Sequence, residues 1–395
     1  MSIDSIVSLT TCVVCGSASL ATVMEMSNFP ITGVFVTESE PGPARGYDQA
    51  LNICRRCGHG QLAFVIPPPQ LYGTDYPHRS SASHLTPTSF AFILNYLDRL
   101  KPNHRFRHVL EIGCNDLMLL NKLGSRADRL TGIDPIWRGR EDEAPLSPNM
   151  TVLGDFVEDV DLATALQEPP DLVISTHNLE HIAHPTEQLC RLVAAAAPDA
   201  LFVIEVPDIA AMARNLRFDQ VFHQHVHYFG LGAFLRMVEA AGARYVDYTL
   251  NPRNWGGTFV FAFSKDGRAA PRFPDVTADE IQAQTSLFKE RMNGLMRMLD
   301  GLEGPIWGYG AAQMLPTLAY HLRSDLSFLQ GVLDDCRFRP GLTYPHLPIP
   351  IRRPEEVDNI SDSTVMITAL DAVRPIMNRL RDFNPRYVVV PIQVF

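Results

Sequence analysis

Long hydrophobic runs are absent from this sequence of 395 residues. A membrane-spanning helix needs about 20 mostly apolar residues in a row, and no stretch of the chain comes close to that length. The opening residues MSIDSIVSLT also lack the basic segment and the following apolar segment of a secretory signal. We therefore expect a cytoplasmic protein that has no membrane partner.

An excess of basic residues is absent too. The chain carries 34 Lys and Arg against 44 Asp and Glu, which gives a formal net charge of −10. Nucleic acid binding depends on basic side chains that neutralise phosphates, so this balance argues against a nucleic acid partner. It does not argue against a nucleotide ligand, because helix N-termini bind phosphate even in an acidic protein.

Internal repeats and low-complexity tracts are missing as well. Apolar residues make up 46% of the chain and charged residues 20%, which is typical of a globular enzyme and not of a disordered chain. A chain of 395 residues is too long for one ordinary hydrophobic core, so two or three domains are expected.

Cysteine is scarce, yet four of the seven cysteines are paired by their spacing. Cys12 with Cys15 and Cys54 with Cys57 form two C-x-x-C knuckles, and Gly58 permits a tight turn after the second. Two such knuckles supply the four thiolates of a tetrahedral structural zinc site. The other three cysteines are dispersed and suggest no disulfide framework. Because a four-thiolate site has no open coordination position, the chemistry must lie elsewhere.

Short apolar runs alternate with helical segments over most of the remaining chain. The expected strands lie near residues 108–113, 130–134, 171–176, 200–206, 305–310, 329–333, 364–370 and 387–391. This alternation predicts an α/β fold with parallel sheets that are covered on both faces. We expect an N-terminal zinc-binding domain of short strands (1–75), a central Rossmann-like domain with a parallel sheet (76–265) and a smaller C-terminal Rossmann-like α/β domain (266–395).

The first strand of the central domain ends in a turn that suits a nucleoside ligand. Gly113, in E-I-G-C-N-D at 111–116, permits a tight turn and a close approach of a ligand to the backbone. Asp134 ends the next strand, where a carboxylate can accept hydrogen bonds from ribose hydroxyls. Asp155 and Phe156 follow another strand-like stretch and can bond and stack an adenine. The pattern suits a dinucleotide or S-adenosylmethionine, although the missing G-x-G-x-x-G weakens the dinucleotide interpretation. A plain βαβ turn with a surface Asp is the alternative.

Taken in order, the motifs resemble those of the zinc-containing, S-adenosylmethionine-dependent nucleotide-sugar C-methyltransferases. The resemblance covers nearly the whole chain. Its motifs are the two cysteine knuckles, D-Y-P at 75–77 with Ser80 and Ser81, E-I-G-C-N-D at 111–116, G-D-F at 154–156, E-V-P at 205–207, H-Q-H at 223–225 before Tyr228 and Phe229, Gly256 and Gly257, G-Y-G-A at 308–311 and L-D-D at 333–335. The resemblance implies methylation of a carbon next to the ketone of a deoxysugar nucleotide, with the substrate bound between domains. The predicted cofactors are S-adenosylmethionine and structural Zn²⁺, and the predicted cofactor-binding residues are Glu111, Gly113, Asn115, Asp116, Asp134, Asp155, Phe156 and Asn178.

The densest group of candidate catalytic residues is F-H-Q-H-V-H-Y at 222–228. Alkylation of a carbon next to a ketone needs a base for the C–H proton and a group that stabilises the enolate. Histidine titrates in the useful range. The resemblance implies that His225 is the base, that His223 is an electrophilic or positioning partner, and that Tyr76 reaches into the active site.

The segment H-N-L-E-H at 177–181 follows a strand end, where loops carry the site in this class of sheet. His181 matches a histidine of the family and is expected, together with Gln224, to orient the substrate. Glu180 is the one nearby carboxylate that could compensate for the missing charge at Gln224. The alternative is that these are ordinary residues at a helix N-terminus, with Asn178 as the cap.

Three residues depart from the family pattern: Phe222 replaces Tyr, Gln224 replaces Glu, and Leu117 replaces Gly. Phe lacks a hydroxyl that could bond the substrate, and Gln can neither take a proton nor carry the charge that would strengthen a neighbouring base. Leu117 either crowds the ligand or leans into the sheet. Three outcomes stay open: C-methylation of a different ketosugar, methylation of another position including oxygen, or a non-methylating isomerase or binding protein on the same scaffold.

Two further motifs allow two interpretations each. If 222–228 is extended, its alternate histidines face one side and could ligate a metal, but no carboxylate follows at a useful spacing, which disfavours that site. G-Y-G at 308–310 and Asp334 resemble a phosphate-binding turn that either contacts the nucleotide of the substrate or serves only packing. The sequence predicts neither the sugar, the nucleotide nor the oligomeric state.

Overall fold

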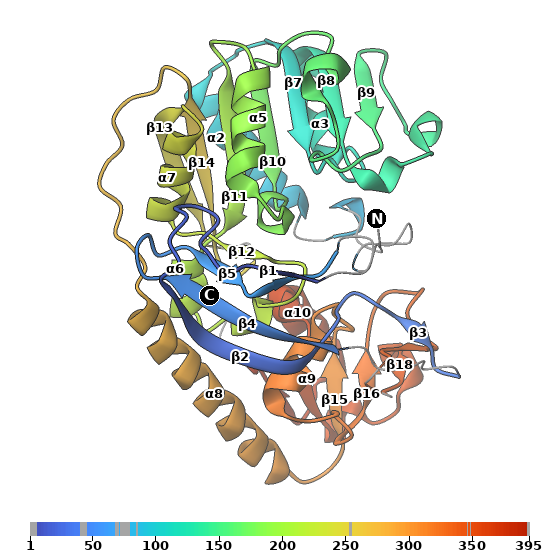
Figure 1. The fold of residues 1–395 in the computed structure, drawn as a ribbon. Coiled ribbons are helices and arrows are strands. Elements are labelled where there is room, and N and C mark those ends of the chain that lie inside the picture. The colour runs from blue at the N-terminus through green and yellow to red at the C-terminus, as the bar shows by residue number, and fades with distance from the viewer. Residues whose placement is uncertain are drawn as a thin grey trace.

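The computed structural model describes residues 6–39, 46–67, 71, 80–83, 86–252, 255–345, 347 and 349–392. Figure 1 shows a central α/β domain, a C-terminal α/β unit below it, and a curved ribbon of N-terminal strands between them. Within the described ranges, no helix combines the length and the apolar character that crossing a bilayer requires. The cytoplasmic location stays a prediction. Tyr76 lies outside the described ranges, as do Asp75 and Pro77 of the same motif.

The N-terminal sheet is built on a long hairpin, so the prediction of short strands alone was wrong. β2 (Leu20–Pro30) pairs with β4 (Gly46–Cys54) in antiparallel fashion, and β5 (Gly60–Leu62) extends the sheet. A further strand, β12 (His227–Tyr228), comes from the central part of the chain and pairs with β5. The hairpin is supported by helix α8 (Ala278–Asp300), which contacts β2 and is distant from it in sequence.

The central sheet has the strand order β13-β14-β11-β10-β7-β8-β9. Its strands are β7 (Phe106–Ile112), β8 (Ala127–Ile133), β9 (Met150–Leu153), β10 (Leu172–Thr176), β11 (Leu201–Pro207), β13 (Arg244–Asn251) and β14 (Thr258–Ser264). The strands from β11 to β9 are parallel, as predicted. β14 is antiparallel to both β11 and β13, which adds a hairpin that the sequence analysis did not predict. The connection between β13 and β14 is too short for a crossover, so the two strands can only run in opposite directions.

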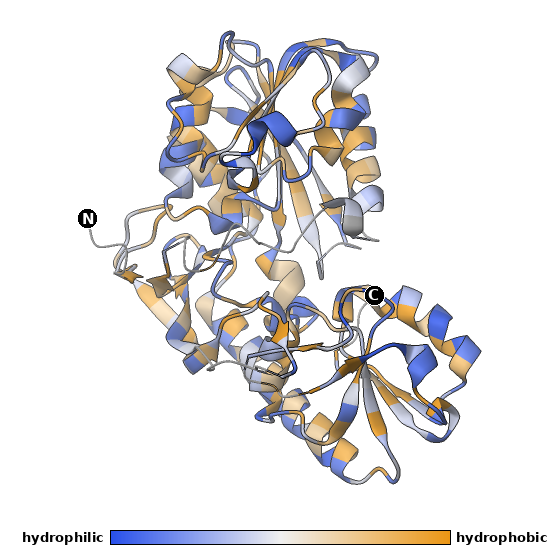
Figure 2. Ribbon diagram, turned by 90° about the vertical axis from the view of Figure 1, so that its right-hand side faces the viewer, coloured by the Kyte–Doolittle hydropathy of each residue, from blue (hydrophilic) through white to orange (hydrophobic). Residues whose placement is uncertain are grey.

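Helices cover both faces of this sheet, so its strands are buried on each side. The helices are α2 (Thr86–Leu100), α3 (Met118–Leu123), α4 (Leu162–Ala165), α5 (Pro185–Ala195) and α7 (Leu231–Ala240). Helix α6 (Ile209–Arg214) instead packs into the core of the N-terminal sheet. Leu189 of α5 and Phe234 of α7 belong to the core on one face, and Phe90 of α2 and Leu119 of α3 to the core on the other. Figure 2 shows the apolar strands between these helices. The predicted cofactor residues Asp134, Asp155 and Asn178 follow the carboxyl ends of β8, β9 and β10, where ligands bind in sheets of this class.

The C-terminal unit repeats the arrangement on a smaller scale, with a parallel sheet in the order β18-β16-β15-β19-β20. Its elements are β15 (Ile306–Tyr309), α9 (Leu315–Leu322), β16 (Leu329–Leu333), β18 (Ile351–Arg352), β19 (Thr364–Ile367), α10 (Val373–Phe383) and β20 (Tyr387–Val389). Helix α8 leads into it and begins at a capping box. The Thr277 hydroxyl accepts the N–H of Glu280 at 3.2 Å, and the Glu280 carboxylate accepts the N–H of Thr277 at 3.0 Å.

One apolar core joins the N-terminal sheet, the C-terminal unit and the segment that holds the candidate catalytic residues. Phe29 of β2, Phe288 of α8 and Leu318 of α9 belong to it together with Phe218 and Phe222. Short strands tie further distant segments: β1 (Val7–Ser8) pairs with β6 (Phe64–Val65), and β3 (Val36–Thr37) with β17 (Leu342–Thr343). The domain boundaries stay predictions, and β12 shows that the N-terminal sheet also draws on later residues.

Candidate active site

The four predicted metal ligands converge in the N-terminal domain. Their sulfur atoms all lie within 4.8 Å of one another, with Cys12 and Cys57 at 3.5 Å and Cys15 and Cys54 at 3.6 Å. A disulfide requires an S–S distance of about 2.05 Å. Sulfurs placed tetrahedrally around zinc, with Zn–S distances of about 2.3 Å, lie about 3.8 Å apart. The four thiols therefore fit a closed, structural Zn²⁺ site.

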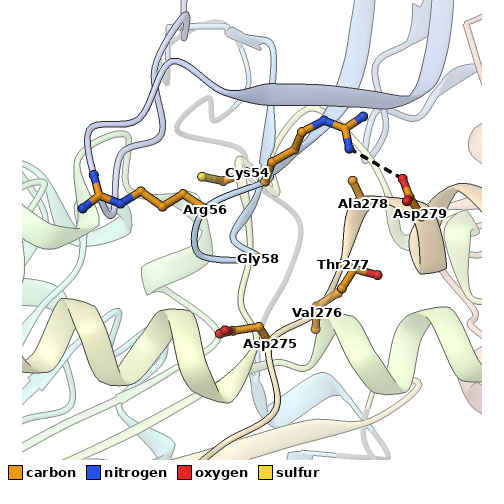
Figure 3. A pocket seen from close by; sticks show the side chains of 9 residues that line it. Cys54, Arg56, Gly58, Asp275, Val276, Thr277, Ala278 and Asp279 are labelled. Atoms are coloured by element: carbon orange, nitrogen blue, oxygen red, sulfur yellow. Dashed lines mark ion pairs between the residues drawn. The ribbon is translucent and has the colours of Figure 1, made fainter.

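A cavity opens beside the second knuckle, away from the predicted catalytic residues (Figure 3). It is lined by Cys54, Arg55, Arg56, Gly58 and residues 275–279. The Arg55 guanidinium and the Asp279 carboxylate form an ion pair at 3.6 Å. Gly58 has a φ of +71°, and a Cβ atom there would lie 2.4 Å from the Val276 carbonyl oxygen. The knuckle turn therefore requires glycine, and we assign no ligand to the cavity.

The turn after β7 has the geometry of a ligand cradle at Gly113. Gly113 has a φ of +72°, and a Cβ atom there would lie 2.8 Å from the Asn178 side chain. Asn178 follows β10, so two strand ends meet at this turn. The Asn178 side chain forms no capping bond to the short helix η5 (Leu179–His181), so the capping interpretation is wrong. Its buried Oδ1 has no hydrogen-bond partner among the described residues.

Asp134 follows β8 and holds the same turn from the other side. Its carboxylate accepts the backbone N–H groups of Asn115 at 2.8 Å and of Ile136 at 3.0 Å. The indole N–H of Trp137 donates to the Asn115 carbonyl at 2.7 Å. A carboxylate offers about four acceptor positions, so these two bonds are compatible with the predicted contact to ribose.

Glu111 and Asp116 flank the turn. The carboxyl group of Glu111 is buried, and burial raises its pKa well above the ordinary value. Asp116 accepts the N–H of Ser81 at 2.8 Å, while Asn115 Oδ1 accepts the N–H of Ser80 at 2.9 Å. Glu111 Oε2 and Asp116 Oδ1 are buried without a partner among the described residues. Such orphaned atoms need an explanation, and a bound polar ligand provides one, so the turn fits a nucleoside cofactor.

The predicted adenine contacts, Asp155 and Phe156, lie just beyond β9. Arg138, which sequence reasoning missed, forms an ion pair with the Asp155 carboxylate. Its guanidinium carbon also lies 5.3 Å from the centre of the Phe156 ring. Arg138 thus occupies one face of that ring, and an adenine would stack on the other face or displace the guanidinium.

The sequence left two possibilities for Leu117: its side chain crowds a ligand, or it leans into the sheet. The structure shows the second, because the side chain is directed into the core. Its φ of +66° places it in the left-handed region, where Gly would be unstrained. Its side chain is fully buried in the core that contains Leu119 and Leu120. The strain of about 1–2 kcal/mol is offset by burial of a Leu side chain, which contributes about 1.5–3 kcal/mol.

Replacing Gly113 by Ala should weaken the binding of S-adenosylhomocysteine about tenfold, because the new methyl group displaces Asn178 and the turn moves to relieve left-handed strain of about 1–2 kcal/mol, so the free protein no longer holds the binding geometry. Isothermal titration calorimetry measures the change. Gly124→Ala is the matched control, since Gly124 has a φ of −53° and a Cβ atom there meets nothing within 4 Å. Equal affinities for the two variants would contradict the placement of the cofactor at Gly113.

The candidate base His225 lies in a buried group of aromatic rings. Its ring centre is 4.9 Å from that of His181 and 4.0 Å from that of Phe222. Burial holds the pKa of His225 well below 6.5, and the neighbouring His181 and His177 lower it further. Its imidazole is therefore neutral at pH 7 and carries a lone pair. His181 Nδ1 lies 2.7 Å from the carbonyl oxygen of Gln224. A carbonyl can only accept, so Nδ1 donates and the His181 ring is fixed in place.

His223 turns away from this group and into the N-terminal sheet. Its Nε2 lies 2.9 Å from the Phe29 carbonyl oxygen, its Nδ1 lies 3.4 Å from the Gln49 amide nitrogen, and its side chain is fully buried. Gln224 also uses its amide internally: Oε1 accepts the Thr32 hydroxyl at 3.1 Å, and Nε2 donates to the Thr32 carbonyl at 3.2 Å. Both side chains therefore hold the segment 222–228 against the end of β2. Contact of either with a sugar stays a prediction.

Two buried carboxylates flank His177, which follows β10 directly. His177 Nδ1 lies 3.3 Å from Glu180 Oε1, and His177 Nε2 lies 3.8 Å from Glu205 Oε2. Both carboxylates are fully buried, and Glu180 Oε2 has no hydrogen-bond partner among the described residues. Sequence reasoning noted Glu180 but missed His177 and Glu205 as site residues. The H-x-x-E spacing of His177 and Glu180 was the available signal.

The alternate histidines of 222–228 point to different partners and form no shared metal site. A different set, Glu180, His181 and His225, has ligand atoms that lie within 4.8 Å of one another. We assign no catalytic metal to this set, because Glu180 is paired with His177 and the Nδ1 of His181 is bonded to a backbone carbonyl.

The second zinc knuckle reaches the candidate catalytic segment through His59. His59 Nε2 lies 3.2 Å from His227 Nδ1, and His227 Nε2 lies 3.3 Å from the Ala183 carbonyl oxygen. Burial lowers the pKa of both histidines, to about 4 for His227, so the bond joins two neutral rings. This bond and the pairing of β12 with β5 tie the zinc domain to the residues around His225.

A fully buried arginine attaches the C-terminal unit to the same segment. The Arg217 guanidinium donates to the Asp219 carboxylate at 2.9 Å and to the Asp371 carboxylate at 3.0 Å. Asp219 lies in η6 (Phe218–Gln220), and Asp371 lies in η9 (Leu370–Ala372) of the C-terminal unit. Both contacts are bidentate, which gives the junction a defined geometry.

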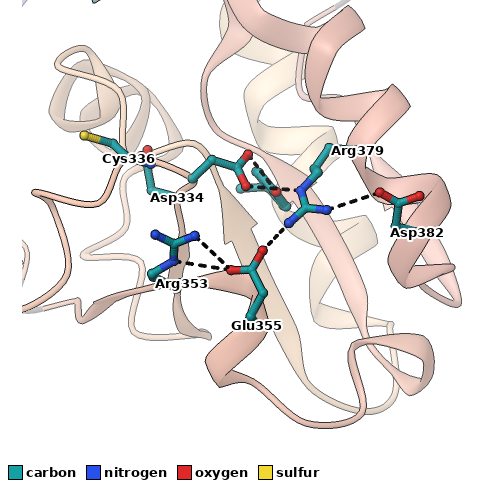
Figure 4. Close-up of polar contacts among 8 residues, drawn as sticks. Asp334, Cys336, Arg353, Glu355, Arg379 and Asp382 are labelled. Carbon is teal, nitrogen blue, oxygen red and sulfur yellow. Dashed lines mark hydrogen bonds and ion pairs between the residues drawn. The ribbon is translucent and has the colours of Figure 1, made fainter.

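Asp334 follows β16 and holds the turn after β15, as Asp134 holds the turn after β7 in the central domain. Its carboxylate accepts the N–H of Ala311 at 2.7 Å and a guanidinium N–H of Arg339 at 2.8 Å. Figure 4 shows the neighbouring ion pairs of Arg379, whose partners are Asp335, Glu355 and Asp382. These pairs are solvent-exposed and contribute little to stability. A contact between this unit and the nucleotide of a substrate stays a prediction.

Comparison with known families matches three consecutive stretches of the chain. Residues 12–72 match a zinc binding domain, residues 87–248 a methyltransferase domain, and residues 277–391 a C-methyltransferase C-terminal domain. The cysteine cluster lies in the first stretch, the cofactor turn and the imidazole group in the second, and the turn at Asp334 in the third.

A curated relative spans the whole arrangement. C-methyltransferase NovU of Streptomyces niveus is 25% identical, and the match covers 96% of this chain and 95% of that protein. Among solved structures, the N-methyltransferase NodS of Bradyrhizobium japonicum with S-adenosylhomocysteine is 18% identical with a TM-score of 0.36, covering 48% of this chain and 91% of NodS. The 1,6-didemethyltoxoflavin-N1-methyltransferase of Burkholderia thailandensis is 17% identical with a TM-score of 0.35, covering 46% and 79%. We base no functional assignment on these two structures, because their TM-scores are low.

Proposed function

This chain belongs to the S-adenosylmethionine-dependent C-methyltransferases that carry a zinc-binding domain, and on that basis we propose that it methylates a carbon next to the ketone of a nucleotide-linked deoxysugar. The observation that supports this reaction most is the buried, neutral imidazole of His225. It packs on His181, whose loop (177–181) meets the cofactor turn at Gly113. The loop 177–181 therefore lies next to both the candidate base and the cofactor turn.

The cofactor turn would hold S-adenosylmethionine through several kinds of contact. The backbone at Gly113 allows close approach, Asp134 accepts hydrogen bonds from ribose, and the buried amide of Asn178 supplies a polar partner. Asp155 and Phe156 would contact the adenine. When bound, the cofactor supplies an electrophilic methyl group on a sulfonium.

In the proposed reaction His225 takes the proton of the carbon acid. The C–H bond next to the ketone breaks, the proton passes to a ring nitrogen of His225, and the electron pair moves onto the ketone oxygen as an enolate. The enolate carbon would then form the new C–C bond to the methyl group as the bond between that methyl group and the sulfonium sulfur breaks, which leaves S-adenosylhomocysteine, and the ketone re-forms. The proton on His225 is released to water, which restores the neutral imidazole.

The two departures leave His225 without a carboxylate at residue 224. The Phe222 ring packs on the imidazole, and the amide of Gln224 is bonded to Thr32, so no carboxylate at residue 224 raises the pKa of His225. An imidazole of low pKa is a weak base. Enolate formation therefore depends strongly on a second group that stabilises the enolate oxygen.

A product analysis tests the proposal. The zinc-loaded protein is incubated with a panel of nucleotide-linked ketosugars and S-adenosylmethionine that carries carbon-13 in its methyl group. We expect a product heavier by one methylene whose labelled methyl is coupled to a ring carbon in the NMR spectrum. A label on oxygen would identify an O-methyltransferase instead. Exchange of a substrate proton with solvent without methyl transfer would identify an isomerase, and either result would contradict the proposal.

A further inference from the structure

Enolate stabilisation needs a cation or a hydrogen-bond donor that can reach the substrate. His223, the partner expected from the sequence, does not meet this need, because its side chain is fully buried and both ring nitrogens contact the N-terminal sheet. His181 directs its Nδ1 to a backbone carbonyl. Neither His223 nor the Nδ1 of His181 can therefore supply this donor.

His177 has the position and the surroundings for this task. It follows the carboxyl end of β10, two residues before the short helix that carries His181. Its side chain is 21% exposed, whereas the Glu180 and Glu205 side chains beside it are fully buried. Its ring centre lies 5.7 Å from that of Trp255. His177 is thus the partly accessible member of a buried charged group.

Both carboxylates are arranged to keep a positive charge on the His177 ring. Glu180 Oε1 lies 3.3 Å from Nδ1, which is within hydrogen-bonding reach, and Glu205 Oε2 lies 3.8 Å from Nε2, which is an ion-pair contact. Glu205 is itself held by the hydroxyl of Thr258 at 2.6 Å and by the amide of Asn251 at 3.4 Å. A buried carboxylate pair with no cation would be strongly destabilising, and an imidazolium between them removes that cost.

We propose that His177 is a further catalytic residue, which donates from its Nε2–H to the enolate oxygen of the substrate, and that Glu180 is the positioning residue that keeps His177 charged. The proposal rests on the C-methyltransferase function proposed above and names a group that the family resemblance did not imply. It also places the carboxylate that is missing at Gln224 on a different element, the helix η5.

The charges around His177 act in the direction that this role requires. Burial lowers the pKa of His177, but the bond to Glu180 and the charges of Glu205, Glu180 and Asp371 outweigh burial and raise it above 6.5. Asp371 is in turn paired with a buried arginine. The other imidazoles in the group, those of His181 and His225, have lowered pKa values and are therefore neutral at pH 7. The pKa of His177 is thus shifted in the opposite direction from the pKa values of His181 and His225.

The proton balance of the step is simple. The substrate proton goes to neutral His225 as the C–H bond breaks, and the negative charge that appears on the ketone oxygen is matched by the His177 imidazolium. No proton leaves His177 if it only donates a hydrogen bond. When the ketone re-forms after methylation, the Nε2–H of His177 is released from the substrate oxygen while Nδ1 stays paired with Glu180, and His225 loses its proton to water.

The pH dependence follows from the two opposite shifts. The reaction requires His225 to be neutral, which holds above its lowered pKa, so activity falls on the acid side only well below pH 6.5. It also requires His177 to be protonated, which holds below its raised pKa, so activity falls on the alkaline side above pH 6.5. Loss of the Glu180 charge lowers the pKa of His177, and the alkaline limb of the profile should then move to lower pH.

The charge on His177 can be measured without a substrate. Nitrogen-15 NMR of the zinc-loaded, full-length protein should show one imidazole that stays protonated above pH 6.5 and disappears in His177→Gln. In Glu180→Gln the titration midpoint of the His177 imidazole should fall by about one unit or more, because the variant loses a neighbouring opposite charge. A His177 that is neutral at pH 6.5 and above would overturn the proposal. Zinc content and circular dichroism confirm that each variant is folded.

The catalytic role is measured by exchange and turnover. With S-adenosylhomocysteine in place of the methyl donor, exchange of the substrate α-hydrogen with deuterated water reports enolate formation alone. His177→Gln should slow this exchange and kcat by about 10²–10³-fold and remove the alkaline limb, while His104→Gln, at an exposed histidine, should match the wild-type protein. If the His177→Gln variant exchanged the α-hydrogen at the wild-type rate and kept the alkaline limb, the proposal would be overturned. Absence of turnover in the wild-type protein would instead refute the proposed function, while the NMR result would still report the charge of His177.

Discussion

Replacing His225 by Asn should lower the rate of methyl transfer about 10³-fold, because positioned general bases contribute about 10²–10⁴-fold. The amide of Asn keeps the polarity of the ring edge but cannot accept the proton of a carbon acid. The cofactor turn around Gly113 lies on a different strand end, so binding of S-adenosylhomocysteine should remain close to that of the wild-type protein. The expected signature is a loss in kcat with little change in cofactor affinity.

Steady-state kinetics and calorimetry on the same preparations separate these two effects. His184→Gln is the matched control, since His184 is exposed at the start of α5 and should leave both quantities unchanged. Retention of more than about a tenth of the wild-type kcat in His225→Asn would be incompatible with the usual contribution of a general base. In that case another group would have to take the substrate proton.

Loss of zinc should unfold the N-terminal sheet and abolish methyl transfer, although the metal takes no part in the chemistry. Structural zinc binding contributes about 10 kcal/mol or more to the folding of small metal domains. A loss of only a few kcal/mol in the free energy of unfolding lowers Tm by about 10 °C in a domain of this size. The effect reaches the site because His59, next to the second knuckle, bonds His227, and β12 pairs with β5.

Cys57→Ser tests this coupling with Cys336→Ser as the control, because Cys336 is a half-buried cysteine of the C-terminal unit that belongs to no metal cluster among the described residues. Metal analysis by mass spectrometry should find one zinc per chain in the control and less in Cys57→Ser. Differential scanning calorimetry should show the lowered Tm, and the turnover assay the lost activity. A zinc-depleted protein with wild-type activity would show that the N-terminal sheet does not hold the catalytic segment.

The parts of the site that lie close together in sequence were predictable. The C-x-x-C spacing brings each pair of thiols together through local turns, so the metal cluster follows from the knuckles themselves. The turn at Gly113 is likewise local, because a strand that ends in Gly before a helix requires a residue that tolerates positive φ. Strands such as β16 (Leu329–Leu333) were also predicted, since buried parallel strands appear as continuous apolar runs.

The parts that depend on distant packing were not predictable. Thr32 bonds Gln224 across 192 positions of sequence, and nothing around Thr32 signals that partner. The side on which each histidine of 222–228 lies depends on β12 joining a sheet formed by residues far upstream. The hairpin of β13 and β14 was missed because its strands lack the helix-separated pattern of the rest of the sheet.

The departures from the family pattern illustrate the same limit. Leu117 was ambiguous in sequence, because a left-handed residue can direct its side chain toward a ligand or toward the core, and only the surrounding side chains show that it is buried. Gln224 could be identified as a lost charge, but the pairing of His177 with the Glu180 and Glu205 carboxylates became visible only with the fold.

The central claim is spatial: the sulfonium of the cofactor lies beside the turn at Gly113 and faces the imidazole of His225. A crystal structure of the zinc-loaded protein with S-adenosylhomocysteine tests it directly. We predict density for the ligand between Gly113, Asp134 and Asn178, with its sulfur directed toward His225. A ligand bound elsewhere, or one whose sulfur faces away from the imidazole group, would contradict the account.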